Sequence, residues 1–189
     1  MNFSSINLRS MSAYFLLALL SMSGFVGSSF ALEEDFVQKE DGKAKQVVGW
    51  LENMRIYPGG MIMRAKLDSG ARSNAMHAEN LELFERDGVE MASFTILKDH
   101  DNPNSESVRI EVPVEKQVNI KLRYTPVRDA RPVVKLEFCM AGQRYSALFS
   151  LTYRSDFNYP VLLGREFLKD HFLVDPSDTF TQRTGCRRD

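Results

Sequence analysis

The chain has 189 residues, with 24 lysine and arginine residues against 25 aspartate and glutamate residues and a formal net charge of −1 at pH 7. This length suits one ordinary domain and is short for two. Because the chain has no basic excess and no block of like charges, its composition argues against a nucleic-acid-binding protein and against binding to acidic lipids.

The first 31 residues have the pattern of a secretory signal peptide. Arg9 supplies a positive charge, residues 14–20 form an apolar core, and Ser29-Phe30-Ala31 places small residues at a suitable cleavage position. An uncleaved anchor is the alternative, but a spanning helix needs about 20 mostly apolar residues, and polar residues follow Leu20. We therefore expect an exported protein, periplasmic in a bacterium, with no membrane span after cleavage.

Composition also divides the remainder of the chain. Residues 32–46 are rich in Glu, Asp, Lys and Gln, which predicts a disordered spacer. The alternating apolar segments that could build a domain lie within residues 47–181, and residues 182–189 form a short tail.

A strand followed by Asp68-Ser69-Gly70-Ala71 is the first notable motif. Residues 61–67 alternate apolar with more polar side chains, which predicts a half-buried strand that presents Asp68 at a turn. Gly70 permits a tight backbone, and the Ser69 hydroxyl could hydrogen-bond to a second copy of the same loop. Asp, Ser and Gly are also ordinary turn residues, so this motif alone does not indicate chemistry.

The second notable motif is Leu162-Leu163-Gly164-Arg165. An apolar run that stops at a glycine predicts a buried strand crossing behind the Asp68 loop.

Most of the remaining chain predicts β structure. Leu81 and Phe84, three residues apart among charged neighbours, favour one short helix over residues 78–85. Residues 98–107 predict an exposed loop, and Ala141-Gly142-Gln143-Arg144 predicts a hairpin connection. Alternating strands are expected over residues 108–114, 118–124, 134–140 and 145–151. These strands, with one small helix and no internal repeat, indicate a compact, mostly antiparallel, barrel-like β domain.

Two cysteines, Cys139 and Cys186, allow a single intramolecular disulfide, which an exported compartment would permit. Alternatively, Cys139 is an ordinary strand residue and Cys186 a free thiol, because nothing in the sequence brings the tail to that strand.

The two motifs, in this order, are similar to those of the retropepsin-like family of bacterial proteins also called RimK-associated or ATP-dependent zinc proteases. The resemblance covers residues 47–181 and rests on separate blocks: Val48-Gly49-Trp50, residues 65–73 with Met76-His77-Ala78, Arg131-Pro132-Val133-Val134, Arg154-Ser155-Asp156, Tyr159 to Arg165, and Phe172 to Pro176. It implies a mostly β fold, namely a closed acid-protease barrel with one short helix and one lobe per chain.

The resemblance further implies an aspartic endopeptidase. Such an enzyme needs two carboxylates that share one proton, and this chain offers a single Asp-Ser-Gly, so the second Asp68 would come from a second copy of the chain. Ser69, Gly70 and Ala71 would support the active-site loop, together with the second motif, Leu162 to Arg165. Peptides or proteins are the expected substrates, and a homodimer is the expected active form. A flap would lie within residues 118–132, although a plain surface hairpin would have the same composition.

This sequence departs from the family pattern at two positions. Ser69 stands where retropepsins usually have threonine. Arg72 stands where viral retropepsins have an aspartate that pairs with the arginine after the second glycine, here Arg165; Glu166 or Asp156 could substitute for that aspartate. Arg72 is therefore a candidate for lining the site. His77, six residues after Ala71, is a second candidate, with a structural hydrogen-bonding role as the alternative.

No cofactor or metal is predicted. The chain lacks a His-Glu-x-x-His motif and a phosphate-binding glycine loop, and the histidines His77, His100 and His171 lack the spacing of zinc ligands. A Ser-His-Asp arrangement using Ser69 and His77 is also disfavoured, because no nucleophile-elbow pattern surrounds Ser69. The competing hypothesis to the peptidase is a non-catalytic retropepsin-like dimer that binds peptides or serves a structural role.

Overall fold

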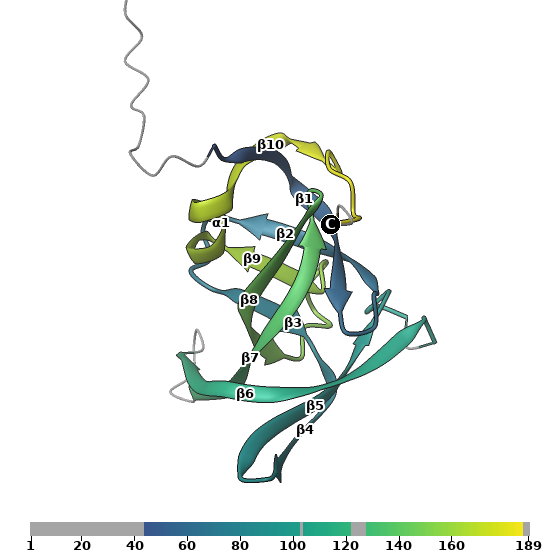
Figure 1. The fold of residues 1–189 in the computed structure, drawn as a ribbon, viewed down its shortest axis with the longest axis vertical. Helices are drawn as coiled ribbons and strands as arrows, with labels where there is room; N and C mark the ends of the chain where they lie inside the picture. Colours follow the sequence, from purple (N-terminus) through teal and green to yellow (C-terminus); the bar gives the residue numbers. More distant parts are fainter. Residues whose placement is uncertain (1–43, 103, 122–127, 187–189) are drawn as a thin grey trace, which may run out of the picture. The chain divides into compact units, whose positions relative to one another are not determined.

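The computed structural model describes residues 44–102, 104–121 and 128–186. The elements are β1 (Gln46–Tyr57), β2 (Ile62–Asp68), β3 (Asn74–His77), β4 (Glu79–Arg86), β5 (Val89–Leu97), β6 (Ser107–Lys121), β7 (Arg128–Met140), β8 (Gln143–Thr152), β9 (Val161–Gly164), α1 (Arg165–His171) and β10 (Phe172–Thr179). This mostly β architecture with one helix confirms the predicted fold class (Figure 1).

The predicted signal peptide and nearly all of the predicted spacer lie outside the described residues. Among the residues that are described, no helix has the length and apolar character needed to cross a membrane.

Part of the sheet closes into a barrel. All strands belong to one sheet in the order β10-β1-β2-β9-β3-β8-β7-β6-β5-β4, and β1 also pairs with β7. This additional antiparallel pairing runs from Arg55 opposite Cys139 to Tyr57 opposite Glu137. Strands β1, β2, β9, β3, β8 and β7 therefore form a closed ring, as predicted, and closure leaves no unpaired edge within it.

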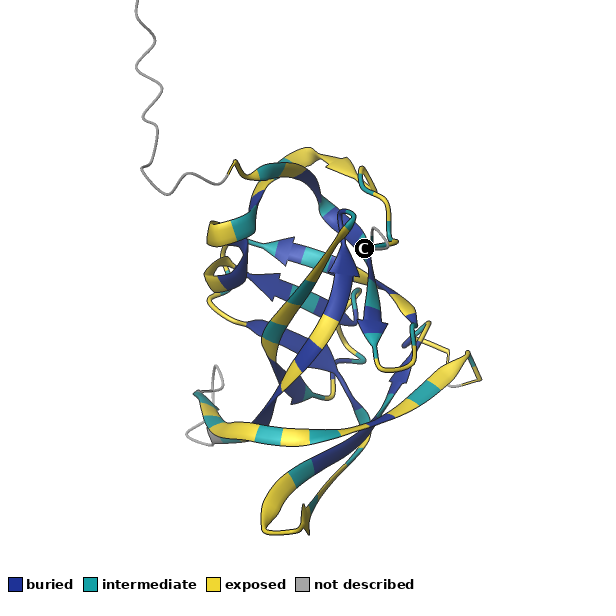
Figure 2. Cartoon of the chain, viewed as in Figure 1, coloured by how far each residue is buried: buried dark blue, intermediate teal, exposed yellow. Residues whose placement is uncertain are grey.

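The core follows from the alternation of side chains along these strands. On β2, Met63, Ala65 and Leu67 are buried while Arg64 is exposed, which confirms the predicted alternation. Larger buried side chains from other strands fill the interior, among them Met54, Ile56, Phe138 and Phe149. Figure 2 shows buried residues gathered on the barrel strands and many exposed residues on β4 and β6.

The predicted helix over residues 78–85 is wrong, because this segment forms strand β4. It pairs antiparallel with β5, and a bulge between Glu79 and Glu82 adds one residue to β4. The added residue interrupts the alternation of a strand, so a three-residue spacing of apolar side chains does not require a helix. Asp87 and Gly88 complete the hairpin with positive φ values of 53° and 78°, which suit a two-residue turn.

The helix instead begins directly after the second motif. Helix α1 carries Glu166 in its first turn and Lys169 and His171 in its last turn, a distribution that complements the helix dipole. Phe167 and Leu168 face the core.

Two predicted connections can be compared with the structure. Ala141 and Gly142, with φ values of 52° and 77°, join β7 to β8 with Met140 opposite Gln143, which confirms the predicted hairpin. Residues 98–106 connect β5 to β6 as predicted, but His100 within this loop is only 4% exposed.

The predicted flap falls on the hairpin between β6 and β7. These strands pair antiparallel as far as Lys121 opposite Arg128. Residues 122–127, where the flap tip would lie, are outside the described residues, so the flap stays a prediction.

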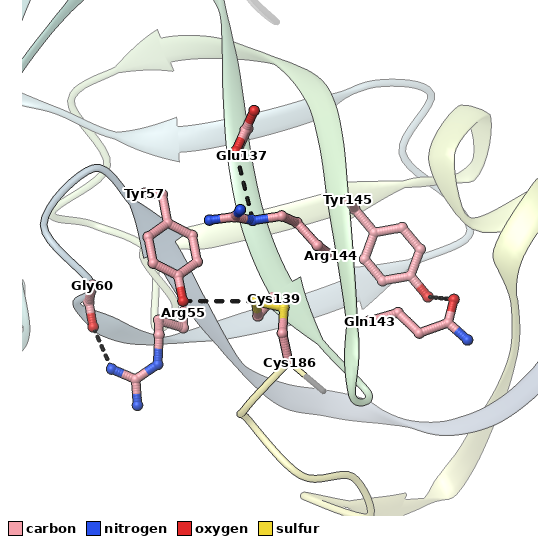
Figure 3. The surroundings of a disulfide bond; sticks show 9 residues. All are labelled: Arg55, Tyr57, Gly60, Glu137, Cys139, Gln143, Arg144, Tyr145 and Cys186. Atoms are coloured by element: carbon pink, nitrogen blue, oxygen red, sulfur yellow. Dashed lines mark hydrogen bonds and ion pairs between the residues drawn. A yellow bond between two sulfur atoms is a disulfide. The ribbon is translucent and has the colours of Figure 1, made fainter. Parts of the chain in front are cut away.

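Segments after β10 return to the barrel and are fixed there by two features. Cys139 on β7 and Cys186 form a disulfide, with their Cα atoms 5.4 Å apart (Figure 3). The fully buried carboxylate of Glu52 on β1 accepts hydrogen bonds from the backbone N–H and the hydroxyl of Thr181, at 3.0 and 2.6 Å. The alternative of a free tail thiol is therefore wrong.

Candidate active site

Asp68 lies at the end of β2, where the two sequence motifs meet. Strand β9 pairs parallel with β2, and this register sets Leu67 opposite Leu163 and Asp68 opposite Gly164. The apolar motif therefore runs beside the strand that presents the carboxylate, as the sequence predicted.

The turn after Asp68 closes around its own carboxylate. Oδ1 accepts hydrogen bonds from the backbone N–H groups of Gly70 at 3.0 Å and Ala71 at 3.2 Å, while the Ala71 N–H also contacts the Asp68 carbonyl at 3.1 Å. A Cβ on Gly70 would lie 3.2 Å from Oδ1, so a larger residue would crowd the carboxylate. These contacts hold Asp68 in one orientation.

The second carboxylate oxygen of Asp68 is bound by a lysine. Lys66, two residues earlier on β2, donates from Nζ to Oδ2 at 3.1 Å. Burial by itself raises the pKa of Asp68, but the hydrogen bond and charge of Lys66, with the Gly70 and Ala71 N–H groups, outweigh it and hold the pKa below its ordinary value. In a single chain the carboxylate is therefore biased toward its ionised form.

Gly164 allows the strand of the second motif to lie directly against the loop. A Cβ at this position would lie 2.7 Å from the backbone of Ser73, a distance that real Cβ atoms essentially never show. The Gly164 N–H donates to the Oδ1 atom of Asn74 at 2.8 Å, and the Asn74 side chain is buried. Asn74 also donates to the Leu148 carbonyl at 2.9 Å, so one amide joins β3, β8 and β9.

Backbone and charged contacts join the start of α1 to the same loop. The N–H groups of Arg165 and Glu166 donate to the carbonyls of Ala71 and Arg72, at 2.9 and 3.1 Å. Glu166 pairs with Arg72 at 2.7 Å, whereas Arg165 donates from Nη1 to the Gly70 carbonyl at 3.2 Å. Glu166, one of the two carboxylates suggested as partners for Arg165, is thus used by Arg72, and Arg165 binds a backbone oxygen instead.

A cleft of about 480 Å³ opens beside Asp68. Its wall is formed by residues from β1, β2, β9 and the segment before β9: Trp50, Lys66, Asp68, Arg154, Asp156, Phe157, Asn158, Tyr159 and Leu162. A larger hollow of about 660 Å³ is lined by Arg72 and Ser73, and Val118 and Ile120 of β6 contribute to its wall. The second hollow does not include Asp68, so the first is the candidate site.

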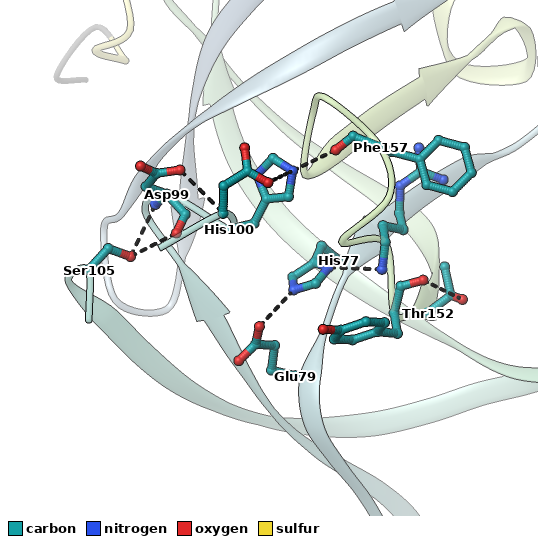
Figure 4. A network of polar contacts seen from close by, with 10 residues as sticks. His77, Glu79, Asp99, His100, Ser105, Thr152 and Phe157 are labelled. Carbon is teal, nitrogen blue, oxygen red and sulfur yellow. Dashed lines mark hydrogen bonds and ion pairs between the residues drawn. The ribbon is translucent and has the colours of Figure 1, made fainter. Parts of the chain in front are cut away.

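His77 is fully buried and does not line the cleft. Its Nδ1 accepts a hydrogen bond from the backbone N–H of Arg154 at 2.9 Å, so the proton of the neutral ring is on Nε2, which faces Glu79 at 3.3 Å. Burial lowers the pKa of His77 more than Glu79 raises it. The ring therefore fixes the segment that begins at Arg154 and forms one wall of the cleft. Figure 4 shows the contact between His77 and Glu79.

Residues 99–101 form the one group of possible metal ligands among the described residues. The ligand atoms of Asp99, His100 and Asp101 lie within 4.8 Å of one another. His100 uses Nε2 to donate to the Phe157 carbonyl at 2.6 Å, and the group shares no residue with the Asp68 cleft. We assign no metal to it.

Asp68, its loop and the second motif are recognisable in the sequence, whereas the roles of Lys66, Asn74 and the Arg154 side chain were not predicted from it. Lys66 could have been recognised, because residues two apart on a strand share a face. The role of Asn74 depends on strands that are distant in the chain, and no local signal indicates it.

A closed β-barrel in which an Asp-Ser-Gly loop is supported by a Gly-Arg strand end defines one lobe of a retropepsin-like fold. A family model described as retropepsin-like aspartic endopeptidase RimB matches residues 47–184. The chain belongs to this RimB-like family, as the resemblance of its motifs predicted.

Similar proteins of known sequence or structure agree with this family. A crystal structure of a Legionella pneumophila protein of unknown function has a TM-score of 0.63 and 29% identity, and the match covers 74% of this chain and 100% of that one. A probable alpha-L-glutamate ligase of Shewanella halifaxensis is 34% identical over 120 residues, which are 62% of this chain and 25% of the ligase. A protein of the same name from Desulfotalea psychrophila is 29% identical over 136 residues. This chain thus spans about a quarter of the length of the curated relatives that it matches.

Proposed function

We propose that this protein is an aspartic endopeptidase whose active form is a homodimer with one Asp68 from each chain. The observation that carries the proposal is the Asp68 carboxylate, fixed by its own loop at the edge of a cleft and supported from behind by Gly164 and Arg165. In the dimer one carboxylate takes a proton from an attacking water while the other, protonated, donates to the carbonyl oxygen of the peptide bond.

Two features of the protomer support a shared site. The Ser69 residue is exposed and its hydroxyl makes no hydrogen bond within the described part of the chain, so it can bond to a second loop. One hollow is lined by Asp68 and the other by Arg72 and Ser73 of the loop that follows, so an extended peptide that occupied both would pass the carboxylates.

Asp156 is the competing source of a second carboxylate, because it lines the same cleft as Asp68. It is exposed and makes none of the contacts that hold the Asp68 carboxylate, which come from Lys66, Gly70 and Ala71. The dimer is therefore the better arrangement.

Mixing of chains tests the shared site. Wild-type protein incubated with excess Asp68→Asn chains, with time for subunit exchange, should lose peptidase activity, because a mixed dimer cannot divide the acid and base roles. Excess Asp156→Asn chains serve as the control. Because these chains keep Asp68, their mixed dimers have both Asp68 carboxylates, and the mixture should retain peptidase activity. Activity that stays proportional to the wild-type chain concentration in both mixtures would show a monomeric site and refute the shared mechanism.

A non-catalytic peptide-binding dimer is the second candidate. Two departures from the family pattern favour it: Ser69 replaces the usual threonine, and Arg72, which pairs with Glu166, replaces the aspartate that pairs with the second-motif arginine in viral retropepsins. Peptide binding that is unchanged by Asp68→Asn, with no cleavage between about pH 4 and pH 8, would support it. Equal cleavage by the wild type and by Asp68→Ala would refute both the role of Asp68 and this alternative.

We also propose that the protein is exported and acts on glutamate-containing peptides. Export is supported by the signal-like residues 1–31 and by a disulfide typical of oxidising compartments. The substrate class is suggested by the name of the relatives, probable alpha-L-glutamate ligase. N-terminal sequencing of the protein from a periplasmic fraction tests the first proposal, and a full-length chain retained in the cytoplasm would contradict it.

A further inference from the structure

Arg154 is the one lysine or arginine that is buried in the described part of the chain, with only 8% of its surface exposed. Its Nε atom has no hydrogen-bond partner. Within residues 44–102, 104–121 and 128–186, its guanidinium forms no ion pair either. A buried charge without a partner is costly, so such a side chain calls for a functional explanation.

The guanidinium of Arg154 lies in the wall of the Asp68 cleft. It stacks on the ring of Phe157, with its central carbon 4.1 Å from the ring centroid. Burial and the charge of Arg131 lower the pKa of Arg154, whereas Asp68 raises it. An arginine remains charged under such shifts at neutral pH. Asp156 lines the same cleft but is exposed and makes no ion pair with it.

Hydrogen bonds of the backbone hold Arg154 in this position. Its N–H donates to His77 Nδ1 at 2.9 Å, and its carbonyl accepts from the Phe157 N–H at 3.0 Å. The Phe157 carbonyl in turn accepts from Nε2 of His100 at 2.6 Å (Figure 4). Two buried histidines therefore fix the segment that carries both Arg154 and its stacking partner, and the guanidinium is organised before any ligand binds.

We propose that Arg154 binds a carboxylate of the substrate, on a residue next to the peptide bond that the Asp68 pair hydrolyses. This inference rests on the proposed function, because Asp68 defines the position of that bond. A guanidinium matches a carboxylate with two parallel hydrogen bonds, and an incoming carboxylate would supply the direct ion pair that no side chain in the described part of the chain makes with Arg154. Glutamate or aspartate is therefore the specified residue, and Arg154 is a specificity determinant.

Cleavage selectivity tests the assignment. Two peptide libraries that differ only in having glutamate or glutamine at matched positions are digested, and kcat/KM is compared for the cleaved pairs. Wild-type protein should prefer the glutamate peptides by about 10–100-fold, the range expected for a charged hydrogen-bonded pair. Arg154→Met should reduce this ratio to near one, whereas Arg64→Met, which removes an exposed arginine of β2, should preserve it. An unchanged ratio in Arg154→Met would overturn the proposal.

A binding measurement separates this inference from the proposed catalysis. Trp50 lines the cleft and is the only tryptophan of the chain, so its fluorescence reports occupancy. With Asp68→Asn protein, acetyl-triglutamate amide should bind more tightly than acetyl-triglutamine amide, and the added Arg154→Met change should abolish the difference. Selective binding of the glutamate peptide, without cleavage of any peptide by the wild type, would refute the proposed peptidase but support the role of Arg154. Cleavage without a preference for glutamate would support the peptidase and refute the role of Arg154.

Thermal unfolding distinguishes binding from packing. Because Arg154→Met replaces an unpaired buried charge with an apolar side chain of similar length, the midpoint of the ligand-free protein should stay unchanged or rise. Acetyl-triglutamate amide should raise the midpoint of the wild type only. A lower midpoint for Arg154→Met, together with no stabilisation of the wild type by the peptide, would assign Arg154 to packing. Arg154→Lys keeps the positive charge but cannot donate two parallel hydrogen bonds to a carboxylate, so its preference for glutamate should lie between those of the wild type and Arg154→Met.

Discussion

The carboxylate of Asp68 is acted on by opposing influences that decide when it titrates. Lys66 and two backbone N–H groups lower its pKa in the protomer. A second carboxylate in a dimer would raise the pKa of the pair, which then titrates as one unit with two macroscopic values. The pH range in which the pair holds a single proton therefore depends on Lys66 as well as on Asp68.

Replacement of Lys66 gives a direct test of this balance. Lys66→Met removes a hydrogen bond and a positive charge from Oδ2, so the pKa of Asp68 should rise and the pH range of peptidase activity should move upward. Carbon NMR titration of the Asp68 carboxyl measures the shift without requiring activity. Lys135→Met, an exposed position on β7, should leave the titration unchanged; equal shifts in both variants would refute the specific role of Lys66.

The same change affects stability with a defined sign. A carboxyl whose folded pKa is depressed contributes stability above its unfolded pKa, and this contribution is lost as the pH falls through the folded value. Because Lys66→Met removes a cause of the depression, the variant should lose less stability on acidification than the wild type.

The contact between β9 and the Asp68 loop is the structural element on which the site depends. It combines a parallel strand pair, the Asn74 amide and two backbone hydrogen bonds from the start of α1. The loop backbone at Arg72 and Ser73 lies so close to Gly164 that no side chain fits at this position.

Gly164→Ala should therefore damage both stability and activity. The added Cβ would force the Ser73 backbone away, at a cost of about 1–3 kcal/mol of unfolding free energy, as for other overpacked sites. Displacement of the loop by about 1 Å could lower kcat/KM by about 100-fold. Urea unfolding and peptide hydrolysis measure the two effects. Gly185→Ala is the matched control, because its Cβ would meet open space, and equal losses in both variants would contradict the steric argument.

The described domain is also held together across long chain separations. The disulfide joins residues 47 positions apart and anchors the segment after β10 to β7, and Glu52 binds the same segment from β1. These links tie the last strand of the chain to the barrel.

Reduction of the disulfide should destabilise the protein without unfolding the barrel. The chain-entropy relation for a loop of this length gives about 4 kcal/mol as an upper value for the loss. Urea unfolding with and without reductant measures it. The Cys139→Ser, Cys186→Ser double variant should match the reduced wild type and be insensitive to reductant; a reductant effect that persists in this variant would contradict the assignment.

Features that depend on short stretches of chain were predictable. The alternation on β2, the turn at Ala141 and Gly142, and the Asp-Ser-Gly loop each follow from local side-chain periodicity and backbone freedom. The helix over residues 78–85 was mispredicted because Leu81 and Phe84 have a spacing that a bulged strand also permits, and pairing with β5 outweighs weak local preference.

Features that depend on distant segments could not be derived from the chain alone. The pairing of Arg72 with Glu166, the amide of Asn74 behind Gly164, and the burial of Arg154 above His77 all join residues at least 77 positions apart. The sequence by itself determines the Asp68 carboxylate at the end of its strand and the glycines that allow close approach, because these are local properties. Which charge lies beside that carboxylate, and which remains without a partner, follows from how barrel closure brings the strands together, since electrostatic energies depend on distances in space and on burial.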